Sequence, residues 1–480
     1  MKFLLLRPAF REENNQSLNK QSLNLPPLGL LYIGASLEKE GHKVEILDYF
    51  AEKITKDRLK KSLNSCDAVG MSVYTDDCVP AADISKLIKE IDSDITLIIG
   101  GPHCTFLQKR SLNDIPHADI SVAGEGENVI LDISKYLEGK KQLANINGIF
   151  YKEKNLIRSG KQLEVIENLD EIPFPARHLV DKYDYSTISF GYLFKKKVTN
   201  FISSKGCPYH CRFCSRYGNI IKNWSFRMRS AENVIKEIQE ISDIYKSIVI
   251  VDDNFLADKK RAHKIFDMLL ESDINVDLLI QGARVDTAEK DLYLKMKKAG
   301  VKYIFYGLES GNQDVLDFYN KNITLQQIRK TVKLAREMKF FIGASFIIGA
   351  PMETDKHIEN TIKLARSLPL DRVNFVPLIY RMGSALWVEA VKNKKIKPNQ
   401  YEVLADKSHN LSNFTEDELI HYTTKAFTSF YFRPYYMFEQ IFKILLRKEF
   451  NLLRNGLKYI LSFNEAKEAG KEIIRSKNIS

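Results

Sequence analysis

Short apolar runs alternate with amphipathic stretches over residues 1–150, and this alternation restricts the fold more than any other feature of the sequence. The runs are rich in aliphatic and β-branched residues, as buried strands are, and the stretches between them show the spacing of helices. A helix between two strands lets the strands pair in parallel, and successive helices then cover both faces of the sheet. Residues 1–150 are therefore predicted to form a doubly wound α/β domain.

A second alternation begins near residue 197 and predicts a barrel over residues 196–385. Its six strand–helix units are too few for the complete eight-unit barrel, which needs about 250 residues, so an open (β/α)6 barrel is expected. The intervening residues 151–195 contain Pro173 and Pro175 and show no periodicity, which predicts a linker. Residues 386–480 show helical spacing and predict a helical C-terminal region.

Composition limits the class of protein and its partners. The chain has no apolar run of about 18 residues, so no membrane-spanning helix is expected. Its 6 cysteines are few for 480 residues, and three of them are crowded together, which argues for a reducing cytoplasm rather than a secreted disulfide framework. The net charge of +11 indicates a solvated basic face, with an acidic substrate, an anionic membrane surface or nucleic acid as alternative partners.

The crowded cysteines lie in residues 206–214, which read Gly-Cys-Pro-Tyr-His-Cys-Arg-Phe-Cys. Thiolates at Cys207, Cys211 and Cys214 can converge on one inorganic centre from a single loop. Three thiolates on a [4Fe–4S] cluster leave one iron open to chelate a substrate. The alternatives are unligated thiols and a zinc ion with His210 as fourth ligand, although zinc sites of that type usually draw on two separated ligand pairs.

This loop, with an aromatic residue before its third cysteine, resembles that of the radical S-adenosylmethionine superfamily. Residues 307–311 (GLESG) and 346–354 (FIIGAPMET) are similar to the fourth- and fifth-strand motifs of the superfamily. The resemblance implies an enzyme whose open iron binds the amino and carboxylate groups of S-adenosylmethionine. Reduction by an external donor of the flavodoxin or ferredoxin type would then give the 5′-deoxyadenosyl radical.

The resemblance also implies cofactor contacts at the ends of the barrel strands. The second strand departs from the GGE-like turn of many members and reads Val-Asp-Asp-Asn at residues 251–254, so either aspartate could receive the methionine amine. The contacts implied for S-adenosylmethionine are Phe213, Asp252, Asp253, Arg284, Glu309 and Gly349.

The N-terminal half resembles the cobalamin-binding domain that precedes many radical S-adenosylmethionine barrels. The resemblance rests on residues 26–48, 72–74, 100–101 and 123–127, taken in that order. Glycines at these strand tips would let the backbone approach a flat macrocycle, whereas the absence of GxGxxG disfavours a dinucleotide. The contacts implied for cobalamin are Ser72, Gly100, Gly101, His103, Gly124, Glu125 and Gly126.

One motif of the cobalamin domain is missing. The DxHxxG motif, whose histidine ligates cobalt, is replaced by residues 26–34, which contain no histidine. Bound cobalamin is therefore expected to be base-off, without a nitrogen ligand from the protein. His103 is the nearest candidate contact, and its alternative role is a loop histidine that packs on a neighbour.

Three further cysteines raise a rival hypothesis. Methylthiotransferases that act on tRNA pair the radical loop with a second cluster in an N-terminal domain. Cys66, Cys78 and Cys104 are scattered, however, and no small basic RNA-binding barrel follows residue 385, so a nucleic-acid partner is disfavoured.

The C-terminal region contains an amphipathic stretch. Its apolar residues fall near helical spacing: Phe438, Ile441, Phe442, Leu445, Leu446, Leu452 and Leu453. Lysines and arginines lie among them, so the helix is predicted to dock on the barrel or, alternatively, to make peripheral contact with an anionic membrane. The preceding residues 430–436 (FYFRPYY) resemble the tail of cobalamin-type members, some of which act on lipids and porphyrins.

Together these features predict radical-initiated C–H activation of a small-molecule or lipid-like organic substrate. Cobalamin-dependent C-methylation is the favoured outcome. Ring closure, oxidation and methylthiolation are the alternatives, and the open-iron loop disfavours a non-enzymatic corrinoid or redox sensor. Substrate contacts lie in loops and in the tail, so the sequence does not specify the substrate.

Overall fold

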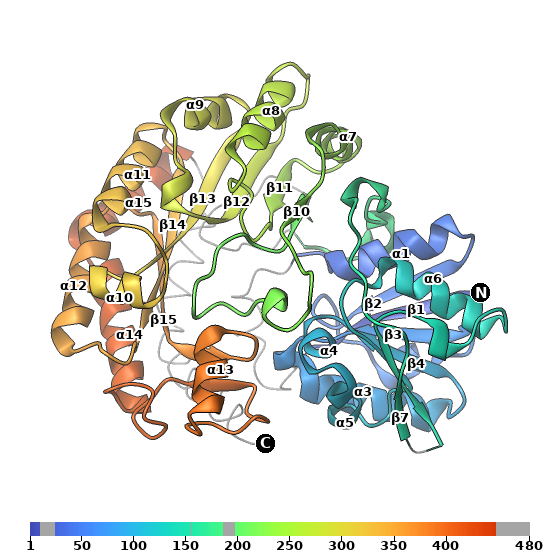
Figure 1. Ribbon diagram of the computed structural model, residues 1–480. Helices are drawn as coiled ribbons and strands as arrows, with labels where there is room; N and C mark the ends of the chain where they lie inside the picture. The colour runs from blue at the N-terminus through green and yellow to red at the C-terminus, as the bar shows by residue number, and fades with distance from the viewer. Residues whose placement is uncertain (10–24, 155, 186–196, 448–480) are drawn as a thin grey trace. The chain divides into compact units, whose positions relative to one another are not determined.

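The computed structural model describes residues 1–9, 25–154, 156–185 and 197–447 (Figure 1). The chain divides into two compact units, which we describe separately. The first unit comprises Met1–Thr187 and Ile220–Arg229, and the second comprises Ile188–Asn219 and Ser230–Ser480.

The first unit is built on a seven-stranded sheet with the order β2-β1-β3-β4-β5-β6-β7. The first five strands are parallel, and β6 and β7 add an antiparallel hairpin at the edge. The strands are β1 (Lys2–Arg7), β2 (Lys43–Asp48), β3 (Ala68–Ser72), β4 (Thr96–Gly100), β5 (Ile120–Val122), β6 (Ile149–Glu153) and β7 (Leu156–Ser159).

Helices cover both faces of this sheet because alternate strand residues point to opposite sides. In β1, Leu4 and Leu6 belong to one buried cluster, whereas Phe3 belongs to a second. The first cluster includes residues of α2 (Lys56–Leu63) and α3 (Cys78–Ile91), and the second includes residues of α1 (Leu28–Lys39) and α6 (Gly126–Leu137). This arrangement confirms the doubly wound α/β fold. The short helices α4 (Pro102–Leu107) and α5 (Ser111–Asp114) follow β4.

The structure differs from the expected linker over residues 151–195. Its beginning lies in the β6–β7 hairpin, and the first unit extends to Thr187. Ile149 and Tyr151 are buried in the cluster that α6 helps to form, while Phe150 packs on the opposite cluster. This two-sided alternation is too short to be recognised in the sequence, but it completes the sheet by pairing with the edge of β5.

The second unit is built on a six-stranded parallel sheet with the order β15-β14-β13-β12-β11-β8. Its end strands β8 and β15 are not paired with each other in the described part of the chain, so the open (β/α)6 barrel is confirmed. The strands are β8 (Val198–Phe201), β11 (Ser247–Ile250), β12 (Asp277–Ala283), β13 (Val301–Glu309), β14 (Phe341–Ile348) and β15 (Arg372–Pro377). The helices between them flank the outer face (Figure 1): α7 (Ala231–Ser242), α8 (Lys259–Leu270), α9 (Lys290–Lys298), α10 (Gln313–Phe318), α11 (Leu325–Glu337) and α12 (Asp355–Ser367).

The end of the described chain is mainly helical. It contains α13 (Ala385–Lys392), α14 (Glu416–Tyr431), α15 (Pro434–Arg447) and a short antiparallel pair, β16 (Ile379–Arg381) with β17 (Glu402–Leu404). The Tyr436 hydroxyl of α15 donates to the Asp371 carbonyl oxygen at 2.6 Å, which docks the helix start on the barrel.

The other face of α15 exposes aromatic side chains. Tyr435 is 80% exposed and Phe438 is 73% exposed. The side chains of Leu445 and Leu446, and all of Leu452 and Leu453, lie outside what the structure describes. No helix in the described ranges is long and apolar enough to cross a membrane.

Candidate functional site

The cysteine loop follows β8 and the two-residue strand β9 (Ser204–Lys205), at the carboxyl edge of the open barrel. Gly206 turns the chain with φ of +82°, a conformation that favours glycine. The Arg212 amide then donates to the Tyr319 carbonyl oxygen at 2.9 Å, and the Asn320 side-chain amide donates to the His210 carbonyl oxygen at 2.9 Å. The loop is therefore held by the segment after α10.

The three loop thiols influence one another, as groups that share one site should. Burial raises the pKa of Cys207, and the nearby Asp253 and Cys211 raise it further. Desolvation by the surrounding protein, with Asp253 and the other two thiols contributing, raises the pKa of Cys214 to about 12. Ligand binding at this loop therefore has to displace thiol protons.

The geometry does not favour zinc at this loop. Within the described chain, the three sulfurs do not form a set within 4.8 Å of one another, as ligands of one ion would. Thiolates of a [4Fe–4S] cluster bind separate irons and lie farther apart. His210, the expected fourth zinc ligand, contacts Arg216 through its Nδ1 atom.

Arg284, at the end of β12, lies against the loop. Its guanidinium carbon is 3.7 Å from the centroid of the Tyr209 ring, and its Nη1 donates to Cys211 Sγ at 3.7 Å. Asp286 accepts from the Nε and Nη2 atoms and fixes the side chain. Arg284 can therefore place positive charge beside a thiolate-bound cluster.

Glu309, at the end of β13, forms a buried ion pair that the sequence did not reveal. Its Oε1 accepts from Lys321 Nζ at 2.7 Å, and both side chains are less than a tenth exposed. Glu309 has φ of +63°, a costly conformation for a residue with a side chain. A Cβ at Gly307 would lie 2.3 Å from Glu309 Oε1, so glycine there makes room for the pair. Lys321 Nζ is also 5.7 Å from the centroid of the Phe213 ring.

The two aspartates after β11 have different surroundings. Asp252 is buried, and its carboxylate accepts from the Ser203 amide and from the hydroxyls of Ser203 and Ser204 at 2.5–2.9 Å. Solvent reaches Asp253, although the protein around it raises its pKa to about 6, with Asp252 contributing. Of the two carboxylates, Asp253 is therefore the one that solvent or a ligand can reach. Asn254 is 1% exposed, and neither polar atom of its amide has a partner in the described residues.

Gly349 directly follows β14 and turns the chain at the end of this strand. Its φ is +107°, and its amide donates to Glu353 Oε2 at 2.6 Å, with the Ala350 amide donating to the same atom at 2.8 Å. Glu353 is fully buried, and burial raises its pKa to about 7. Its Oε1 has no partner in the described residues.

Replacing Glu353 with glutamine should change how stability depends on pH. A folded-state pKa above the ordinary glutamate pKa of 4.5 means that the folded protein binds this proton more tightly than the unfolded chain does. Protonation of Glu353 therefore stabilises the folded state. This stabilisation is complete below pH 4.5 and is lost as pH rises through about 7. The stability of the wild type relative to Glu353→Gln should therefore fall by about 3 kcal/mol between pH 4.5 and 8. Urea unfolding at a series of pH values measures this difference, and a constant difference would contradict it.

In the first unit, Ser72 and Gly100 are register partners at the ends of β3 and β4. The next residue, Gly101, has φ of +99°, and a Cβ there would lie 3.0 Å from the Val73 carbonyl oxygen. A Cβ at Gly100, by contrast, would meet nothing closer than Val122 at 3.7 Å. The backbone conformation and the nearby Val73 carbonyl oxygen therefore require glycine at position 101, whereas a Cβ at position 100 would make an ordinary contact with Val122.

Of the other glycines assigned to cobalamin, Gly124 has φ of +86°, a conformation that favours glycine. A Cβ at Gly124 would lie 2.7 Å from Leu163, and one at Gly126 would lie 2.8 Å from Ile33. Between them, both oxygens of the buried Glu125 accept from Arg227 at 2.9 and 3.0 Å. The Glu125 carboxylate is thus committed to an internal ion pair.

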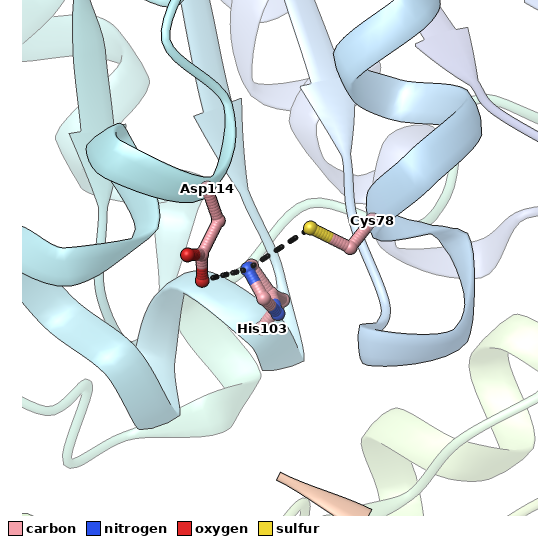
Figure 2. Close-up of side chains that lie close together, drawn as sticks. All are labelled: Cys78, His103 and Asp114. Carbon is pink, nitrogen blue, oxygen red and sulfur yellow. Dashed lines mark hydrogen bonds and ion pairs between the residues drawn. The ribbon is translucent and has the colours of Figure 1, made fainter. Parts of the chain in front are cut away.

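His103 lies on α4 and is completely buried (Figure 2). Its Nε2 is 3.5 Å from Cys78 Sγ and 3.3 Å from Asp114 Oδ2. Cys66 lies before β3, whereas Cys78 comes after it, so the sheet separates the two thiols. Cys66, Cys78 and Cys104 therefore do not provide the second cluster of the methylthiotransferase hypothesis.

Comparison with known proteins identifies the family. A model of the radical SAM superfamily matches residues 201–365, and a model of the B12 binding domain matches residues 18–134. An uncharacterized methyltransferase of Pyrococcus horikoshii is 32% identical over 92% of this chain and 95% of its own length. The chain belongs to the cobalamin-binding radical S-adenosylmethionine enzymes.

This radical enzyme also resembles one further curated protein and one solved structure. The anaerobic magnesium-protoporphyrin IX monomethyl ester cyclase of Rubrivivax gelatinosus is 27% identical over 73% of this chain and 64% of its own length. A solved structure of the cobalamin-dependent radical enzyme OxsB, with aqua-cobalamin and S-adenosylmethionine bound, has a TM-score of 0.69. At 18% identity over 96% of this chain and 72% of that one, it supports the fold.

The residues present fit the cofactors of the family, which are a [4Fe–4S] cluster, S-adenosylmethionine and cobalamin. Three thiols share a loop beside Arg284, and the unpartnered amide of Asn254 lies at a barrel strand end. Ser72 and Gly100 lie together at the carboxyl edge of the first sheet, which is where ligands of such sheets bind.

Proposed function

We propose that this radical enzyme transfers a methyl group to a carbon atom of a small organic substrate, with cobalamin as the methyl carrier. The observation that carries the proposal is the 32% identity to a methyltransferase along nearly the whole of both chains. That relative is itself uncharacterized, so the reaction class needs a direct test. The proposed substrate is a small organic molecule.

When bound, the cluster and S-adenosylmethionine supply a carbon-centred radical, and cobalamin carries a methyl group. We propose that Cys207, Cys211 and Cys214 hold the cluster and that Arg284 balances its negative charge. Asp253 is the proposed acceptor for the methionine amine, because the oxygens of Asp252 are engaged by Ser203 and Ser204.

The remaining S-adenosylmethionine contacts are assigned by position. Glu309 would meet the cofactor with its carboxylate fixed by Lys321, which is a new member of the site. Phe213 would offer a ring face beside that ion pair. Gly349 would let the backbone lie close to the cofactor without donating a hydrogen bond to it, since its amide already donates to Glu353.

On the cobalamin side, Ser72 and Gly100 are the proposed direct contacts, with Gly101, Gly124 and Gly126 shaping the loops around them. Glu125 would act through its ion pair with Arg227. His103 would support the proposed cobalamin contacts from within the fold, because its side chain is completely buried and its Nε2 faces Cys78 and Asp114. We therefore propose that the bound cobalt has no nitrogen ligand from His103.

The experiment that tests methylation uses methyl-labelled S-adenosylmethionine under anaerobic, reducing conditions, with a small-molecule extract of the source cells. One molecule donates methyl and another yields the radical, so S-adenosylhomocysteine and 5′-deoxyadenosine should form in near-equal amounts, with label in the product. Cys207→Ala should abolish 5′-deoxyadenosine. Substrate-dependent 5′-deoxyadenosine without S-adenosylhomocysteine would overturn methylation.

That contrary result would favour ring closure, which is the second candidate. It is supported by the 27% identity to the protoporphyrin ester cyclase, although this chain spans only 64% of that relative. The same residues would hold the cluster and S-adenosylmethionine in either reaction, so the product ratio distinguishes the two outcomes.

We propose a cytoplasmic location, which the few crowded cysteines support, and an external electron donor of the flavodoxin or ferredoxin type. Peripheral membrane contact through α15 is a further proposal. It is supported by the exposed Tyr435, Phe438 and Phe442 and by the lysines and arginines near them in the sequence.

A further inference from the structure

Three different metal-binding side chains converge in the first unit, away from the cysteine loop in the sequence. Cys78 opens α3, His103 lies on α4, and Asp114 ends α5. Figure 2 shows the thiol, the imidazole and the carboxylate pointing toward one another, and their ligand atoms all lie within 4.8 Å. This is the only such group of three among the described residues.

The spacing of these atoms matches a tetrahedral zinc ion. Zinc binds sulfur at about 2.3 Å and nitrogen or oxygen at about 2.0–2.2 Å, which at tetrahedral angles separates sulfur from nitrogen by about 3.6 Å and nitrogen from oxygen by about 3.4 Å. The corresponding distances here are 3.5 Å from Cys78 Sγ to His103 Nε2 and 3.3 Å from that nitrogen to Asp114 Oδ2.

A hydrogen-bonded Cys–His–Asp relay does not explain the arrangement. In such a relay the thiol and the carboxylate lie on different ring nitrogens, so that the imidazole accepts from one and donates to the other. Here both Cys78 and Asp114 lie at Nε2 of His103 (Figure 2). One ring nitrogen cannot accept from the thiol while it donates to the carboxylate, whereas one cation can bind all three atoms.

We propose that Cys78, His103 and Asp114 bind one Zn²⁺ ion, with water as the fourth ligand. A thiolate, an imidazole and a carboxylate suit zinc, and binding releases the thiol proton to solvent. The ion would tie the segment after β3 to the helices after β4. This site goes beyond the proposed function, because neither methyl transfer nor radical formation requires it.

The test is metal analysis of the full-length protein, purified anaerobically after growth with zinc. We expect about one zinc per chain in addition to iron and cobalt. Cys78→Ala and Asp114→Asn should each weaken zinc binding at least tenfold in competition with a chromophoric chelator. Cys66→Ala and Asp83→Asn are matched controls in the same unit and should retain the wild-type affinity.

A further variant tests whether the zinc is bound at the cysteine loop instead. Replacing Cys207, Cys211 and Cys214 with alanine should leave the zinc in place, whereas zinc lost in that variant would overturn the proposal. The proposal is also overturned if the wild type takes up no zinc, or if neither Cys78→Ala nor Asp114→Asn lowers its affinity. Circular dichroism checks that each variant is folded, and Asp114→Asn keeps the side-chain shape.

Discussion

Replacing Cys207, Cys211 and Cys214 together with alanine is expected to remove nearly all of about four irons per chain and all cleavage of S-adenosylmethionine. One cluster with three thiolate ligands accounts for that amount of iron. The barrel should remain folded, because the loop lies at its edge and the buried apolar core lies between the sheet and its outer helices. Iron analysis after anaerobic reconstitution and chromatography of 5′-deoxyadenosine measure the two losses.

The control variant carries alanine at Cys66 and Cys104, which are the other thiols outside the proposed zinc site. It should keep its iron, because Cys66 lies before β3 and Cys104 lies on α4 after β4, at opposite ends of the sheet. Retention of half the iron or more in the triple variant would contradict the single-cluster assignment. It would require a second cluster elsewhere in the chain.

Lys321→Met is expected to destabilise the enzyme by about 3–5 kcal/mol, because it leaves Glu309 as a buried carboxylate without its cation. S-adenosylmethionine cleavage should fall about 100-fold, since a small displacement of Glu309 or Phe213 spoils the placement of the cofactor. Urea unfolding gives the stability change, and the rate of 5′-deoxyadenosine formation gives the activity change.

Two companion variants test whether loss of the ion pair between Lys321 and Glu309 causes the loss of stability. Adding Glu309→Gln to Lys321→Met should recover part of the stability, because no uncompensated charge remains, while activity stays low. Lys264→Met makes the same substitution in the exposed ion pair with Glu232 and should change stability little. A Lys321→Met enzyme as stable as the wild type would show that the pair does not anchor Glu309.

The sequence was sufficient to predict the two α/β units, and it placed the proposed cluster ligands in one loop, because both features depend on local patterns. Alternation of strand and helix determines a parallel sheet, and parallel strands bring their carboxyl ends to one edge. Cys207, Cys211 and Cys214 lie within one loop, so their spacing alone indicates a shared centre. The GLESG and GAPMET motifs marked two strand ends in the same way.

Only the tertiary structure decided which partners these residues have. Asp252 and Asp253 are adjacent in the sequence, yet Asp252 is engaged by Ser203 and Ser204 from the neighbouring strand end. Glu125 pairs with Arg227, 102 residues away, where the chain returns to the first unit. No periodicity or motif predicts contacts of that kind.

The same holds for Lys321 and for the group of Cys78, His103 and Asp114. Lys321 meets Glu309 because the strand β13 ends in a left-handed residue and the chain returns after α10. The other three residues meet because β3 and β4 are neighbours in the sheet, so the helices that follow them begin side by side. Local patterns fix the strands and their order of appearance, whereas strand neighbours and backbone turns decide which distant side chains touch.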